Sequence, residues 1–163
     1  MKDQNLNPYS WTKSKNIELI HNYKEWFNLD FAICYFYNVF GPKQITTGPY
    51  ATVIGIFEDQ YKNNKPLTVV KPGTQTRCFT HIEDITDGII LVAEKGNGDK
   101  YFLGTKENIS IIEIAQMFNY PYIFIDKRKG ERDTSTIIES KIKELGWNPN
   151  LKIKDYIKKI IDA

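Results

Sequence analysis

The sequence has 163 residues, and a domain of about this length buries roughly 70% of the surface that its unfolded chain exposes. Its 22 basic and 20 acidic side chains nearly cancel, which argues against nucleic acid or a membrane surface as a partner. No stretch approaches the roughly 18 apolar residues of a membrane span, and the polar residues 1–5 lack a signal-peptide core.

The two cysteines, Cys34 and Cys78, are too few for a disulfide framework or a metal site with recognisable spacing, so we expect no bound metal. Each lies in an apolar or strand-like run, which is typical of buried, reduced thiols. We therefore expect a cytoplasmic protein.

Taken in chain order, the first expected element is a helix over Tyr9–Phe27, since its apolar residues recur at spacings of three and four. The unbroken apolar run Phe31–Tyr37 predicts a strand covered on both faces, as in a parallel sheet. A loop follows Gly41 and Pro42, and a second helix is expected over residues 51–63.

Short strands and helices then alternate along the rest of the chain. Strands are expected over residues 67–70, 77–81, 101–104 and 122–125, and helices over residues 83–94, 111–118, 139–145 and 154–161. This mixture predicts an α/β or α+β fold. The first helix and strand belong to a sheet whose other strands the sequence does not reveal.

Tyr9 and Lys13 form a Tyr-x-x-x-Lys pair on the first helix. Residues four apart share a helix face, so the Lys13 ammonium can approach the Tyr9 hydroxyl. A free phenol has a pKa of roughly 10, and a nearby cation lowers it toward the range of a useful base. The spacing also arises by chance, so by itself it does not establish a catalytic pair.

Four segments together resemble signatures of the extended short-chain dehydrogenase/reductases, the NAD-dependent epimerase/dehydratase family. Residues 7–15 resemble its catalytic helix, and residues 35–42 its strand ending in Asn-Val-Tyr-Gly-Pro. Residues 72–84 are similar to its Gly-x-Gln-x-Arg-x-Phe segment. Residues 128–131 and 140–149 are similar to its Arg-Pro-Gly-Glu and Leu-Gly-Trp-x-Pro signatures. Their order and separations match the C-terminal half of a family member, most like UDP-glucose 4-epimerase.

The resemblance implies a role for each matching residue. Tyr9 would be the general base and acid, and Lys13 would tune it and contact the nicotinamide ribose; Phe36 would also lie against the NAD cofactor. The implied contacts to a UDP-sugar substrate come from Asn38, Tyr50, Ala51, Thr68, Val70, Gln75, Arg77, Arg128 and Glu131, with the two arginines on the phosphates and Glu131 on a ribose hydroxyl.

Other interpretations of these residues stay open on the sequence alone. Asn38 also suits a cap of the turn before Gly41, and either arginine suits a surface ion pair. The sequence departs from the family pattern at three positions, with Tyr35 in place of Arg, Lys71 in place of Gly and Cys78 in place of Asp. Lys71 places a cation beside the expected base-binding strand and obscures which base is bound.

The ten glycines never form the Gly-rich turn with which a dinucleotide fold approaches a pyrophosphate. The small hydroxyl residue that the family places before its tyrosine has no counterpart among the eight residues preceding Tyr9. The resemblance therefore implies an incomplete Rossmann-type fold: residues 1–45 as a remnant of the cofactor domain, and residues 46–163 as a small mixed α/β nucleotide-sugar-binding domain.

The leading functional hypothesis is a fragment of an NAD-dependent nucleotide-sugar 4-epimerase, inactive as an isolated chain. A 4,6-dehydratase or decarboxylase of the same family is the alternative within the class. Other hypotheses are a non-catalytic sugar-nucleotide-binding module, one subunit of a split enzyme whose Rossmann half is another chain, and a simple truncation. Family members often dimerise through two helices in each subunit, and residues 9–27 resemble one of them. The other helix has no counterpart in this sequence, so the resemblance does not favour a homodimer.

Overall fold

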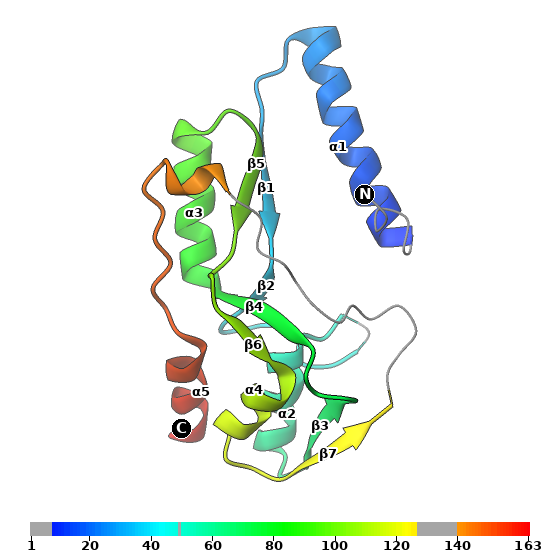
Figure 1. Ribbon diagram of the computed structural model, residues 1–163, viewed down its shortest axis with the longest axis vertical. Coiled ribbons are helices and arrows are strands. Elements are labelled where there is room, and N and C mark those ends of the chain that lie inside the picture. Colours follow the sequence, from blue (N-terminus) through cyan, green and yellow to red (C-terminus); the bar gives the residue numbers. More distant parts are fainter. Residues whose placement is uncertain (1–7, 49, 127–139) are drawn as a thin grey trace.

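The structure is a computed structural model that describes residues 8–48, 50–126 and 140–163. One long helix stands at one end, and strands with helices packed on them make up the rest (Figure 1). In chain order, the elements are α1 (Pro8–Phe27), β1 (Ala32–Phe36), β2 (Asn38–Phe40), α2 (Val53–Lys62), β3 (Leu67–Val70), β4 (Thr76–His81), α3 (Ile82–Lys95), β5 (Gly98–Leu103), β6 (Asn108–Ser110), α4 (Ile111–Met117), β7 (Tyr122–Ile125), the 3₁₀ helix η1 (Lys141–Lys143) and α5 (Ile153–Ile161).

The strands form three small sheets, and most neighbouring strands run parallel. β1 pairs with β5, and β3 pairs with β7, both in parallel. β4 is central to the third sheet, with β2 parallel on one edge and β6 antiparallel on the other. The mixed α/β fold with parallel pairs confirms the predicted fold class.

Local sequence explains where the helices begin and end. The Thr52 side chain accepts a hydrogen bond from the backbone N–H of Gly55 and so caps α2. Ser110 and Glu113 form a capping box at the start of α4, with the Ser110 N–H 2.8 Å from a Glu113 carboxylate oxygen. At the end of α1, Asn28 adopts a φ of 53° and its N–H bonds to the Lys24 carbonyl.

Two hydrophobic clusters form the core of the described structure outside α1. The larger one lies among α2, α4, α5 and strands β2, β3, β4 and β6, and Phe57, Leu67 and Ile114 are completely buried in it. The smaller one joins α3, β5 and η1, with Leu103 completely buried and Cys34 of β1 packed against it. α3 and β5 therefore pack with β1, although the predicted boundary between residues 1–45 and 46–163 places β1 in one domain and α3 and β5 in the other. That boundary stays a prediction.

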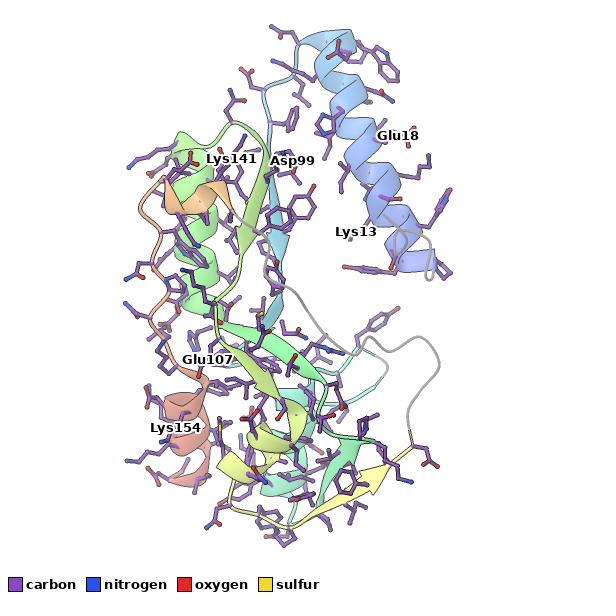
Figure 2. All side chains as sticks on the ribbon, viewed as in Figure 1. Lys13, Glu18, Asp99, Glu107, Lys141 and Lys154 are labelled. Atoms are coloured by element: carbon purple, nitrogen blue, oxygen red, sulfur yellow. The ribbon has the colours of Figure 1, made fainter. Side chains whose placement is uncertain are left out.

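Helix α1 differs from the other long helices because none of its described residues is buried. Trp26 and Phe27 are 62% and 68% exposed, and Leu19 is 49% exposed. In Figure 2 the side chains of α1, Lys13 and Glu18 among them, radiate from the helix. None of the helices in the described ranges is long and apolar enough to cross a bilayer.

Three details differ from the sequence-based expectations. The strand predicted over Phe31–Tyr37 is β1, which ends at Phe36, and β2 follows after Tyr37 in a different sheet. Phe36 is 52% exposed rather than covered. β6 was not predicted, because its three residues carry no periodicity and run directly into the α4 cap. The helix expected over 139–145 is a single 3₁₀ turn where described, since Gly146 follows with a φ of 89°.

Candidate functional site

A cavity of about 800 Å³ opens among α2, β2, β3, β4 and the loop between β2 and α2. Its lining includes six of the substrate-binding residues implied by the resemblance, and they come from separate parts of the chain: Asn38, Ala51, Thr68, Val70, Gln75 and Arg77. Asn38 begins β2, Thr68 and Val70 belong to β3, and Arg77 lies in β4. The parallel pairing of β2 with β4 and the packing of α2 on β3 bring these residues to one place.

The walls of this cavity combine one cation with apolar and neutral polar surface. A guanidinium nitrogen of Arg77 donates to the Thr76 carbonyl at 2.8 Å, and the side chain is half-buried. Val70, Phe79 and Ile125 contribute apolar surface. Such a cavity suits a ligand with one anionic part and one flat, less polar part.

The start of α2 adds to the positive potential of the cavity. Thr52 caps this helix, and Thr52, Val53 and Ile54 all line the cavity. The first N–H groups of a helix have no carbonyl partner within it and carry partial positive charge. Together with Arg77, this helix end favours a phosphate or another anion.

Gln75 and Gln60 fix the strand that borders the cavity. The Gln75 amide nitrogen donates to the Val70 carbonyl at 2.9 Å, while its buried oxygen has no hydrogen-bond partner among the described residues. Gln60 bonds Thr68 twice, through the Thr68 N–H at 2.9 Å and the Thr68 hydroxyl at 2.8 Å. Both amides hold β3 in place, and the Thr68 hydroxyl is already engaged by Gln60.

Sequence reasoning missed the rim of the cavity. Thr46, Thr47 and Gly48 line it from the loop between β2 and α2, and Gln60 lines it from α2. The polar, glycine-containing run after Pro42 predicted a loop but gave no sign of where that loop would lie. Only the packing of the loop on α2 shows that it borders the cavity.

The predicted catalytic pair lies on α1, outside this cavity. The Lys13 ammonium lies 5.6 Å from the centre of the Tyr9 ring, so the two side chains approach each other as the four-residue spacing predicts. Tyr9 is 70% exposed. The pair is therefore open on the outer surface of the described structure.

The remaining predicted residues fall into two groups. Phe36 and Tyr50 are exposed and do not line the cavity, although Tyr50 precedes Ala51, which does. Arg128 and Glu131 lie outside the described residues. A second cavity of about 920 Å³, between β6 and residues 147–155, is lined by none of the predicted site residues.

Comparisons with known proteins give the class of this chain. Residues 2–104 match the NAD dependent epimerase/dehydratase family, and the chain belongs to that family. The match covers the Tyr9–Lys13 pair, the loop that forms the rim and the strands that bear Thr68 and Arg77.

The individual relatives include an epimerase and a dehydratase. It is 31% identical to an uncharacterized UDP-glucose epimerase, YtcB, of Bacillus subtilis (strain 168), over 92% of this chain and 49% of that protein. It is 27% identical to a dTDP-D-glucose 4,6-dehydratase of Bos taurus, over 98% of this chain and 48% of that protein. The chain thus spans about half the length of the relatives that it matches.

A solved structure shows the same fold. The UDP-glucuronic acid 4-epimerase from Bacillus cereus, in complex with UDP-glucuronic acid and NAD, superimposes with a TM-score of 0.85 at 28% identity, over 96% of this chain and 52% of that one. The sequence-based recognition of the family is confirmed.

Proposed function

We propose that this chain is the substrate-binding part of an NAD-dependent nucleotide-sugar 4-epimerase, and that its 800 Å³ cavity holds the nucleoside diphosphate of a UDP-sugar. The observation that carries the proposal is the gathering of Asn38, Ala51, Thr68, Val70, Gln75 and Arg77 around one cavity, although they come from separate segments of the chain. Relatives of both the epimerase and the dehydratase kind match the chain. The UDP-glucose epimerase from Bacillus subtilis is 31% identical over 92% of it, against 27% over 98% for the dehydratase of Bos taurus.

In this proposal the cavity distinguishes the parts of the ligand by chemistry. Arg77 and the start of α2 pair with the diphosphate, because a guanidinium forms two parallel hydrogen bonds with phosphate oxygens. The apolar surface of Val70 and Ile125 receives the flat base. Asn38, which also lines the cavity, offers an amide to the diphosphate region.

The residues present fit the cofactor only in part. NAD supplies a hydride acceptor when it is bound in the complete enzyme, whereas this sequence contains no Gly-rich turn for its pyrophosphate. Tyr9 would accept the proton from the sugar hydroxyl, and the Lys13 ammonium lies 5.6 Å from the centre of the Tyr9 ring on the same face of α1. The exposed apolar side chains of α1 belong with this proposal, since a cofactor-binding part would cover them.

The direct test is a set of calorimetric titrations of the purified chain with UDP, UDP-glucose and NAD⁺, each alone. We expect saturable binding of both uridine ligands and none of NAD⁺. Arg77→Ala should weaken UDP binding about 10- to 100-fold, which corresponds to the loss of a hydrogen bond to a charged group. Lys106→Ala is the matched control, because Lys106 is an exposed cation that lines the other cavity.

Either of two results would overturn the proposal. The first is a chain that is folded by circular dichroism and binds neither uridine ligand. The second is that Arg77→Ala and Lys106→Ala weaken UDP binding equally. The phosphates would then bind elsewhere, or be held only by the overall positive charge.

A further inference from the structure

The loop that forms the rim of the cavity is fixed on both sides of its cavity-lining residues. Thr46, Thr47 and Gly48 line the cavity. On one side lie Gln44 and Ile45, and on the other Ala51 and Thr52, whose N–H groups bond to Gly48 and Ile45 carbonyls at 3.2 and 3.1 Å. The positions of the rim residues therefore depend on what holds these two flanks.

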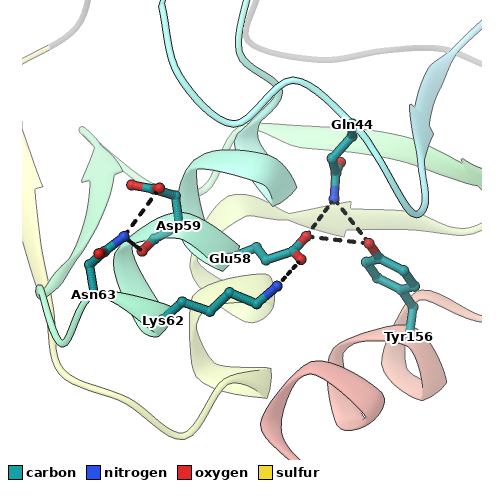
Figure 3. A network of polar contacts seen from close by, with 6 residues as sticks. All are labelled: Gln44, Glu58, Asp59, Lys62, Asn63 and Tyr156. Carbon is teal, nitrogen blue, oxygen red and sulfur yellow. Dashed lines mark hydrogen bonds and ion pairs between the residues drawn. The ribbon is translucent and has the colours of Figure 1, made fainter. Parts of the chain in front are cut away.

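One side chain, Gln44, joins both flanks to two helices. Figure 3 shows its contacts with Glu58 and Tyr156. Its amide nitrogen donates to a Glu58 carboxylate oxygen of α2 at 3.1 Å and to the Tyr156 hydroxyl of α5 at 3.3 Å. Its amide oxygen accepts a hydrogen bond from the Thr52 hydroxyl at 2.8 Å. We call these three hydrogen bonds the Gln44 bridge.

The surroundings make the Gln44 bridge specific to a neutral amide. Glu58 is largely buried, and its other oxygen lies 2.7 Å from the Lys62 ammonium. The Tyr156 hydroxyl also donates to Glu58 at 3.3 Å, and burial together with the Glu58 charge raises the pKa of Tyr156 to about 12. Both N–H bonds of Gln44 thus point at acceptors, and its oxygen points at a donor. Among the ordinary side chains of this length, only an amide or a protonated carboxyl group supplies both.

We propose that Gln44 is a positioning residue for ligand binding: by tying the rim loop to α2 and α5, it sets the placement of Thr46, Thr47 and Gly48 in the lining of the nucleotide-sugar cavity. This inference rests on the proposed function for the identity of the ligand. It assigns to α5, which lies outside the cavity lining, a part in shaping the site through Tyr156.

The first test compares Gln44→Ala with Gln116→Ala, a matched control at an exposed position of α4. Amide hydrogen exchange over residues 43–52 should be faster in Gln44→Ala, at Ala51 and Thr52 above all, and unchanged in the control. UDP should bind Gln44→Ala about 3- to 10-fold more weakly, the range that corresponds to the net contribution of one hydrogen bond. Tyr156→Phe, which keeps the ring packed 5.4 Å from Phe40, should show the same changes to a smaller extent.

The second test separates positioning from a general loss of stability by a pH profile. In Gln44→Glu the new carboxyl group faces Glu58 at about the distance of the amide nitrogen. Because two carboxylates in such contact share one proton, one pKa of the pair is raised. Below that pKa, the shared proton remakes the bond to Glu58 while the other oxygen still accepts from Thr52. Above it, the two carboxylates repel each other and the loop is released.

The affinity of Gln44→Glu for UDP, divided by that of the unsubstituted chain at the same pH, should therefore rise as the pH falls from about 8 to about 5.5. The other charged and titratable groups at this place, Lys62, Tyr156 and His81, whose ring lies 5.9 Å from that of Tyr156, are present in both proteins and largely cancel in the ratio.

A ratio that does not change with pH, or wild-type exchange of residues 43–52 in Gln44→Ala, would overturn the inference. Failure of the proposed function gives a different pattern. If the unsubstituted chain binds no UDP while Gln44→Ala still speeds exchange of residues 43–52, the bridge holds the loop but the ligand assignment is wrong.

Discussion

Gly55 lies at a close approach of the rim loop to α2, and Gly55→Ala tests that contact. A methyl group added there would lie 2.5 Å from the Ile45 carbonyl oxygen and 3.0 Å from the Thr52 hydroxyl. The Ile45 oxygen belongs to the backbone, so the loop must move by about 0.9 Å to reach the 3.4 Å at which ordinary contacts begin. That movement pulls on the bond between the Thr52 N–H and the Ile45 carbonyl.

Two opposing effects decide the sign of the change in stability. Alanine is a better helix former than glycine by about 1 kcal/mol. Overpacking costs about 1–3 kcal/mol, and the strained hydrogen bond adds about 1 kcal/mol. We expect a net destabilisation of about 1–3 kcal/mol, which for a chain of this length lowers the melting temperature by about 2–12 °C.

The assay is denaturant unfolding followed by circular dichroism, with UDP titration of the folded variant. Thr86→Ala on the exposed face of α3 is the control, because it improves helix propensity and removes atoms instead of adding them. It gives up only an exposed hydrogen bond from the Thr86 hydroxyl to the Ile82 carbonyl. The reasoning is refuted if Gly55→Ala stabilises the protein as much as helix propensity predicts, since the loop would then not press on α2.

Two further substitutions test hydrogen bonds that hold the start of α4 and the segment before α5. Ser110→Ala removes the capping box of α4 and should cost about 1 kcal/mol in thermal or denaturant unfolding. Hydrogen bonds from Ser110 lower the pKa of Glu113. Their contribution to the free energy of unfolding is therefore present above the ordinary carboxyl pKa and is lost as the pH falls through the lowered pKa. The difference in stability between wild type and Ser110→Ala should narrow below about pH 4, and a difference of constant size would contradict this. The Asp84 carboxylate accepts hydrogen bonds from the backbone N–H groups of Asn150 at 3.3 Å and Leu151 at 3.0 Å. Asp84→Ala removes this acceptor and should lower the free energy of unfolding in urea by about 2–3 kcal/mol. An unchanged midpoint would show that water replaces the carboxylate.

Elements with clear boundaries in the sequence could be predicted closely. β3 and β7 have the predicted bounds, because the first lies between Pro66 and the Lys71–Pro72 turn and the second directly follows Pro121. Helix α1 was predicted within one residue from its periodicity. That periodicity gives a helical face but not what covers it, and the face proves to be exposed in the described structure.

The cavity could be predicted as a set of residues but not as a shape. Short signatures identified Asn38, Gln75 and Arg77 because each lies in a segment with its own local pattern. The rim and the Gln44 bridge could not be found in this way, because Gln44 and Tyr156 are separated by 112 positions. Their contact depends on how α5 packs against α4 and β4, and no local pattern encodes that packing.

The location of the ligand is the central claim, and hydrogen-exchange footprinting of the chain with saturating UDP-glucose tests it most directly. The account predicts slower exchange in residues 46–54, 68–70 and 75–77, which surround the 800 Å³ cavity, and no change in residues 104–107 and 147–155 around the larger one. Protection confined to the second set of residues, or protection in neither set, would contradict it.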